Sequence, residues 1–204
     1  GLWLAYRFAS RFTSRSMALV ATLALSFGFT VIHYIAVEPS MAHGLTIFTV
    51  AAFLRYMYDH RMDDSWKKWA VLGVLGGLMM QSRWQEGFFF VVPAIYWIHS
   101  FLNAKGSAKR LRLVGMGVLF VASVLVVFSP QMIAWKVLFG GATHLPDSVI
   151  GIIDFANPLL FDFLFSFQHS IFVSTPLIAL AMFGLPYAYR KDKFFVAALV
   201  VPLL

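Results

Sequence analysis

Short clusters of basic residues separate long apolar segments along this chain, and this alternation restricts the possible folds more than any other feature. Fourteen of the sixteen Lys and Arg residues fall into four such clusters. The clusters are Arg7/Arg11/Arg15, Arg55/Arg61/Lys67/Lys68, Lys105/Lys109/Arg110/Arg112 and Arg190/Lys191/Lys193. Because the basic loops of a membrane protein stay in the cytoplasm, the pattern predicts repeated crossings of a bilayer. The two exceptions, Arg83 and Lys136, fall on the opposite, extracytoplasmic side.

The composition also indicates an integral membrane protein. The chain is 60% hydrophobic and only 12% charged, whereas a soluble domain has about 25% charged residues. The net charge of +7 does not indicate nucleic-acid binding, because the basic residues stand in short runs, as in loops that face anionic lipid. The absence of cysteine excludes disulfides and thiolate metal sites. We therefore expect a multi-pass protein of the inner (cytoplasmic) membrane.

The apolar segments predict an all-α transmembrane bundle with six complete spans and a partial seventh. The expected spans are residues 17–37, 40–58, two within 69–102, 113–133, 170–189 and a partial one at 194–204. The pair within 69–102 has about 17 residues per pass, or roughly 25 Å of helix. The turn at residues 81–87 is therefore expected at or below the outer membrane surface.

The chain is expected to form a single transmembrane domain over residues 1–204, and its ends indicate a fragment of a longer protein. The cytoplasmic loops are too short to hold a soluble domain. An extracytoplasmic loop is predicted at residues 134–169, with an interfacial amphipathic helix at 155–167. Any chemistry is therefore expected on the extracytoplasmic face.

Polar residues that this topology places outside form the candidate site. Arginine binds phosphate through paired hydrogen bonds and lysine acts as a point charge, so an outward pocket with both favours an anionic head group. The substrate-binding candidates are Arg83, Gln85, Glu86, Lys136, His169, Glu38 and His43.

Each candidate also has a purely structural explanation. Arg83 and Glu86 are spaced to pair with each other, and Lys136 can extend to the phosphates of the outer lipids. Glu38 is placed to complement a helix dipole, with His43 as an interfacial residue. Glu38 and His43 are also weak candidates for a metal site, although two ligands do not define one. A divalent metal therefore stays open.

The glycines at positions 73, 76 and 77 have the small-xxx-small spacing that favours close packing of membrane helices over a ligand site. The sequence contains no glycine-rich phosphate loop, no GxSxG elbow and no HExxH motif. The chemistry of nucleotide binding and of hydrolases is therefore not indicated.

The order of several loose motifs resembles bacterial membrane glycosyltransferases of the GT-C superfamily, in particular glycosyltransferase family 39 and protein-mannosyltransferase-like enzymes. The resemblance covers about residues 17 to 193. It is carried by the runs 38–43 (EPSMAH), 76–86 with Arg83-Trp84-Gln85-Glu86, 129–140 (SPQMIAWKVLFG) and 164–169 (LFSFQH), and by Thr175-Pro176 and Gly184-Leu185.

The resemblance implies an enzyme that transfers a sugar from a polyprenyl-phosphate donor to an extracytoplasmic protein, lipid or glycan acceptor. It also implies that the catalytic carboxylate lies in a loop upstream of this chain, so no residue here is expected to act as the base. Arg83 and Lys136, with His169, are then expected to contact the donor phosphate. The alternatives are a multi-pass transporter or lipid flippase with an outward polar cavity, and a structural subunit. Transporters usually show internal repeats, and no repeat is visible here.

Overall fold

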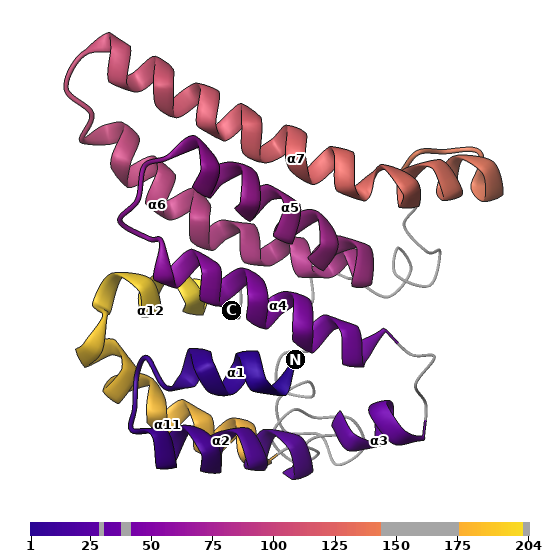
Figure 1. The fold of residues 1–204 in the computed structure, drawn as a ribbon, viewed down its shortest axis with the longest axis vertical. Helices are drawn as coiled ribbons and strands as arrows, with labels where there is room; N and C mark the ends of the chain where they lie inside the picture. The colour runs from indigo at the N-terminus through magenta and orange to yellow at the C-terminus, as the bar shows by residue number, and fades with distance from the viewer. Residues whose placement is uncertain (29–30, 38–41, 144–175, 202–204) are drawn as a thin grey trace, which may run out of the picture. The chain divides into compact units, whose positions relative to one another are not determined.

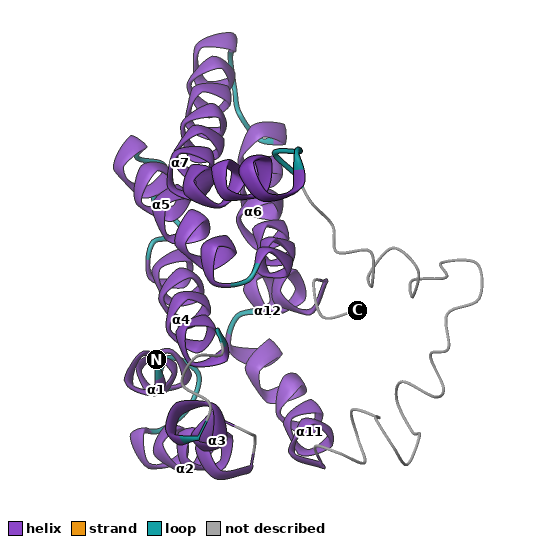
Figure 2. Cartoon of the chain, turned by 90° about the vertical axis from the view of Figure 1, so that its right-hand side faces the viewer, coloured by secondary structure: helices purple, strands orange, loops and turns teal. Residues whose placement is uncertain are grey.

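The computed structural model describes residues 1–28, 31–37, 42–143 and 176–201, and every regular element in them is a helix (Figures 1 and 2). The all-α prediction is confirmed for this part of the chain. The helices are α1 (Leu2–Ala9), α2 (Arg15–Gly28), α3 (Val31–Ala36), α4 (His43–Asp59), α5 (Trp66–Ser82), the 3-10 helix η1 (Trp84–Phe90), α6 (Val91–Leu102), α7 (Ser107–Phe139), α11 (Pro176–Lys191) and α12 (Lys193–Val200). The interfacial helix predicted at 155–167 lies outside the described residues.

The prediction of six complete spans needs correction. Among the described residues, only α7, with 33 residues, is long and apolar enough to cross a membrane. Helices α4 and α5 have 17 residues each and α6 has 12. At 1.5 Å per residue, 17 residues reach roughly 25 Å, less than the ~30 Å hydrocarbon core. The predicted hairpin at 69–102 is short because Arg83 and η1 occupy its middle.

The chain divides into two units, residues Gly1–Phe128 with Leu185–Leu204, and Ser129–Gly184. Each border lies beside a proline inside a helix, Pro130 in α7 and Pro186 in α11. Proline in a helix interior removes a backbone donor and disturbs the regular packing. In the second unit, Gly140 ends α7 with a φ of +79°, a left-handed conformation that glycine adopts readily.

Helix α4 lies at the centre of the first unit, between α1 and α5 (Figure 1). Its residues Phe53 and Met57 are fully buried in the hydrophobic core. The rings of Phe8 and Phe195 meet Tyr58 of α4 at centroid distances of 6.1 and 4.8 Å. These contacts join α1, α4 and α12, so the two ends of the chain share one core.

Glycines allow α5 to approach the first part of α7 closely. A Cβ added at Gly73 would lie 2.5 Å from the backbone oxygen of Phe120, and one at Gly77 would lie 2.6 Å from Cβ of Val127. Only a residue without a side chain fits at such separations. The close packing predicted from the glycine spacing is therefore confirmed.

Residues of the four basic clusters and their neighbours meet at one end of the first unit. The contacts are Arg11 Nη2 to Asp59 Oδ1 (2.9 Å), Arg61 Nε to Asp192 Oδ2 (2.8 Å) and Arg112 Nη2 to the backbone oxygen of Asp64 (3.1 Å). Lys68 is buried beside them and donates to the backbone oxygen of Asp63 at 2.7 Å. Helix α5 begins at this basic end, so its last residue, Ser82, and Arg83 lie at the opposite end of the helix.

Candidate functional site

The candidate site is built around Arg83, where α5 stops. Arg83 has an extended backbone, with φ −154° and ψ 119°, and the chain then continues into η1. Its Nη1 lies 3.1 Å from Nδ1 of His43, the first residue of α4. The end of one helix and the beginning of another therefore bring together two residues that are forty positions apart.

The contact with Arg83 indicates the tautomer of the His43 ring. A guanidinium has only N–H donors, so Nδ1 of His43 must accept the hydrogen bond. The imidazole is then neutral and carries its proton on Nε2. The ring of Tyr34 in α3 stacks on that of His43, with the centroids 4.1 Å apart and the planes at 29°.

Hydroxyl groups near His43 and Arg83 also connect the start of α4 with the end of α5. The Oγ1 of Thr46 donates to Oγ of Ser82 at 3.4 Å, and Oγ1 of Thr49 lies 3.1 Å from that oxygen. Ser82 in turn donates to the backbone oxygen of Met79 at 2.7 Å. These bonds hold the start of α4 against the end of α5, and so fix the backbone positions of His43 and Arg83.

Glu86 lies three residues after Arg83, in the first turn of η1, the 3-10 helix between α5 and α6. Burial raises the pKa of the Glu86 carboxyl, and the nearby charge of Arg83 partly opposes that rise. The ion pair between Glu86 and Arg83 that the spacing allows is absent from the described residues, where Arg83 donates to His43 instead. The carboxylate therefore acts on Arg83 only at longer range.

A recess of about 470 Å³ adjoins this turn. Its lining residues are Trp84, Gln85, Gly87, Phe88, Phe90, Val91 and Ala94. Gln85 supplies the one side-chain amide among mostly apolar neighbours. The recess shares the lining residues Phe90 and Ala94 with a larger groove.

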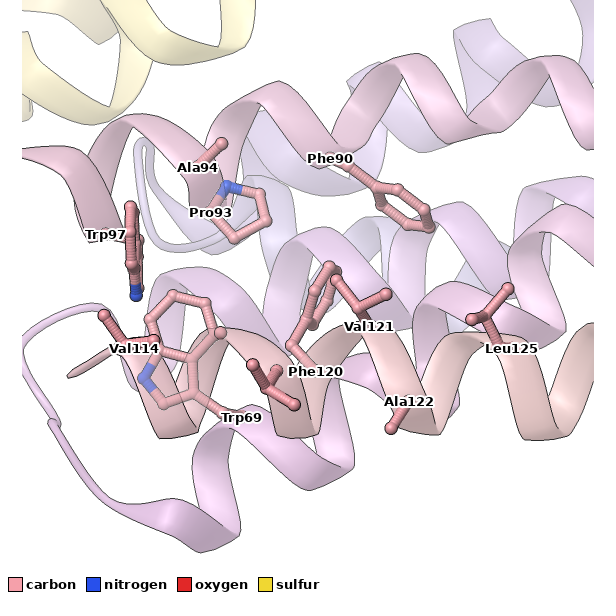
Figure 3. Close-up of a pocket in the computed structure, with 12 residues that line it drawn as sticks. Trp69, Phe90, Pro93, Ala94, Trp97, Val114, Phe120, Val121, Ala122 and Leu125 are labelled. Carbon is pink, nitrogen blue, oxygen red and sulfur yellow. The ribbon is translucent and has the colours of Figure 1, made fainter. Parts of the chain in front are cut away.

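The larger groove has a volume of about 780 Å³ and lies between α5, α6 and the first part of α7 (Figure 3). Figure 3 shows the rings of Trp69 and Trp97 at one end and Phe90 farther along. Apart from the indole nitrogens its lining side chains are apolar, and Trp97 Nε1 donates to the backbone oxygen of Leu113 at 2.8 Å. An apolar groove therefore runs beside α6 and shares two lining residues with the recess that follows Arg83.

The structure brings together four of the seven predicted site residues. The four are His43, Arg83, Gln85 and Glu86, which lie at the end of α5 opposite the basic clusters. Lys136 is exposed in the last turn of α7 and belongs to the second unit. Glu38 and His169 lie outside the described residues, so their roles stay predictions. No group of three or more potential metal ligands occurs among the residues described here.

Sequence reasoning did not select Tyr34, Thr46, Thr49 or Ser82. The helical spacing of His43, Thr46 and Thr49 was a usable signal, because residues three apart lie on one side of a helix. Tyr34 belongs to a separate short helix, and its distance from His43 depends on a tertiary contact that no local spacing reports.

The family model for dolichyl-phosphate-mannose-protein mannosyltransferases matches residues 1–135, about two-thirds of the chain. The chain belongs to this family. This mannosyltransferase-family protein is accordingly a membrane glycosyltransferase of the GT-C type, as the sequence motifs predicted. The match includes Tyr34, His43 and Arg83 and ends just before Lys136. No curated protein and no solved structure matches the chain.

Proposed function

We propose that this protein transfers a sugar from a polyprenyl-phosphate donor to an extracytoplasmic acceptor, and that Arg83 binds the donor phosphate. One observation carries the proposal. The half-buried guanidinium of Arg83 is held by a neutral imidazole rather than a carboxylate, beside an apolar recess that continues into a groove. The family membership supports the same reaction class.

Arg83 is suited to phosphate because no described carboxylate forms an ion pair with it. A guanidinium has five N–H donors in a fixed plane, and the contact with His43 uses only one nitrogen. The others can donate to phosphate oxygens in the paired geometry that arginine favours. When the bond between sugar and phosphate breaks, negative charge develops on the departing phosphate. A fixed cation at this place lowers the barrier by stabilising that charge.

The groove along α6 is suited to the lipid part of the donor. An isoprenoid chain needs an apolar surface, and the groove offers Trp69, Phe90, Trp97 and the aliphatic side chains of α7 (Figure 3). The recess beside Gln85 is lined by Trp84 and Gln85, which directly follow Arg83, and it shares Phe90 and Ala94 with the groove. The phosphate would then lie at Arg83, with the lipid chain extending along α6 and the Gln85 amide available to a sugar hydroxyl.

The remaining sequence candidates are also proposed to contribute to the reaction. Lys136 and His169 are proposed as further phosphate contacts, and Glu38 and His43 as further candidates for donor binding. An inverting transfer also needs a carboxylate that deprotonates the acceptor, and we assign that role to none of the described residues. A divalent metal at Glu38 and His43 is left open.

The decisive experiment measures transfer of radiolabelled sugar from polyprenyl-phosphate donors by membranes that carry the full-length protein. Arg83→Ala is expected to raise the donor KM at least about tenfold, since a charged hydrogen-bonding partner is lost. Arg83→Lys is expected to fall between Arg83→Ala and wild type, because an ammonium cannot make the paired contact. The matched control is Arg15→Ala, which removes an exposed arginine from the basic end.

Two results would contradict the proposal. A wild-type donor KM for Arg83→Ala would remove Arg83 from the phosphate site. Movement of a labelled lipid-linked sugar across the membrane without transfer to any acceptor would instead favour the transporter or flippase.

A further inference from the structure

Tyr34, His43 and Arg83 form a sequence of contacts across three helices. The ring of Tyr34 in α3 stacks on His43 at the start of α4, with centroids 4.1 Å apart. Nδ1 of His43 lies 3.1 Å from Nη1 of Arg83 at the end of α5. Each contact restrains a different degree of freedom, because the stack sets the plane of the imidazole and the hydrogen bond sets the guanidinium.

Restraining Arg83 in advance matters for binding. A long arginine side chain loses rotamer freedom when it binds a phosphate, and that loss weakens binding. A side chain that is already fixed in the unliganded protein loses less. The neutral imidazole is well suited to this task, since it fixes Nη1 without neutralising the charge that the phosphate needs.

We propose that His43 and Tyr34 are positioning residues for Arg83: Tyr34 orients the imidazole, and the imidazole holds the guanidinium in the orientation that receives the donor phosphate. This inference rests on the proposed function of Arg83. It adds two residues to that site whose effects are exerted through Arg83 and not through contact with the donor.

The chain contains a matched pair that serves as a control. Tyr56 and His60 stack at the basic end with centroids 4.2 Å apart and planes at 28°, nearly the same geometry as Tyr34 and His43. Nδ1 of His60 lies 3.0 Å from the backbone oxygen of Tyr56, so it must carry the proton and donate. His60 therefore has the opposite tautomer and has a carbonyl as its partner.

The experiment compares variants of the full-length protein in membranes, with donor KM, acceptor KM and kcat measured for each. His43→Ala is expected to raise the donor KM about tenfold, the effect of losing one hydrogen bond to a charged group. His43→Asn is expected to stay within about threefold of wild type, because Oδ1 of asparagine is the same number of bonds from Cα as Nδ1 and also accepts. Tyr34→Phe keeps the stack and should be close to wild type, whereas Tyr34→Leu should resemble His43→Ala. His60→Ala should leave the donor KM unchanged.

A double-variant cycle separates this inference from the function on which it rests. If His43 acts through Arg83, then His43→Ala adds nothing to the donor KM once Arg83→Ala is present. An unchanged KM for His43→Ala alongside a raised KM for Arg83→Ala overturns the positioning role and leaves the proposed function intact. A wild-type KM for Arg83→Ala overturns both. Equal KM values for His43→Ala and His43→Asn, or a fall in kcat alone, also overturn the positioning role.

Discussion

The contact between α5 and α7 at Gly73 gives the sharpest test of the fold. Alanine at this position would place Cβ 2.5 Å from the backbone oxygen of Phe120 and 2.6 Å from Cβ of Ser123. Ordinary contacts between carbon and oxygen begin near 3.3 Å, so the two helices must separate by roughly 0.8 Å. A backbone oxygen cannot rotate out of the way, and overpacking of this kind costs about 1–3 kcal/mol.

Alanine also favours a helix over glycine, by about 1 kcal/mol, and this gain must be separated from the clash. Gly184→Ala provides the separation, because a Cβ there meets nothing within 4 Å. Both glycines lie inside helices, so the difference between the two variants reports the clash alone.

The assay is thermal unfolding of the purified full-length protein in detergent, followed by tryptophan fluorescence. For a protein of this size, 1 kcal/mol corresponds to about 2–4 °C in Tm. Gly73→Ala is therefore expected to melt about 2–12 °C below Gly184→Ala. Equal melting temperatures would refute the close approach of α5 to α7.

Three further predictions concern the site and its supports. Burial raises the pKa of Glu86, so the ionised carboxylate weakens the fold at neutral pH, and this effect fades as the pH falls toward the ordinary pKa of 4.5. Glu86→Gln should therefore have a higher Tm than wild type near pH 7.5, and the difference in Tm should close near pH 4.5. Asp192 pairs with Arg61 and accepts the N–H of Phe195 as the N-cap of α12, so Asp192→Ala should lose about 1–3 kcal/mol by denaturant unfolding and Asp192→Ser, which keeps a cap, about half of that. Ala94 lies where the recess joins the groove, so Ala94→Phe should raise the donor KM several-fold for long polyprenyl chains and hardly at all for a short-chain analogue.

The sequence predicted the all-α class of fold better than it predicted the number and length of the membrane spans. Hydropathy and the basic clusters predicted helices in the right places, because burial in lipid and the sidedness of Lys and Arg are properties of local composition. The turn predicted at 81–87 contains the actual break at Arg83. Span length was less predictable, because apolar runs do not show where a helix ends: the 3-10 helix η1 replaces α-helix over seven residues.

The candidate site was predictable only in part, for a related reason. Arg83 was selected because it lies outside the four basic clusters, and the amino-acid sequence alone shows such an exception. Its partner was predicted less well, since the spacing favoured Glu86 but the structure gives His43. Which residue contacts Arg83 depends on how α4 packs against α5. The hydroxyl contact between Thr46 and Ser82 supports this packing, but it has no distinctive sequence motif.

Helices α5 and α6 are both shorter than the hydrocarbon core of a bilayer. At 17 and 12 residues they reach roughly 25 and 18 Å, whereas α7 exceeds the ~30 Å core alone. During synthesis, α5 and α6 emerge before α7, and we expect them to be retained only once α7 packs against Gly73 and Gly77. In a nascent chain ending at residue 104, α5 and α6 should thus stay open to added protease, and in one extended through Phe139 they should be protected. The glycines of α5 would then govern the order of membrane insertion as well as the stability of the finished fold.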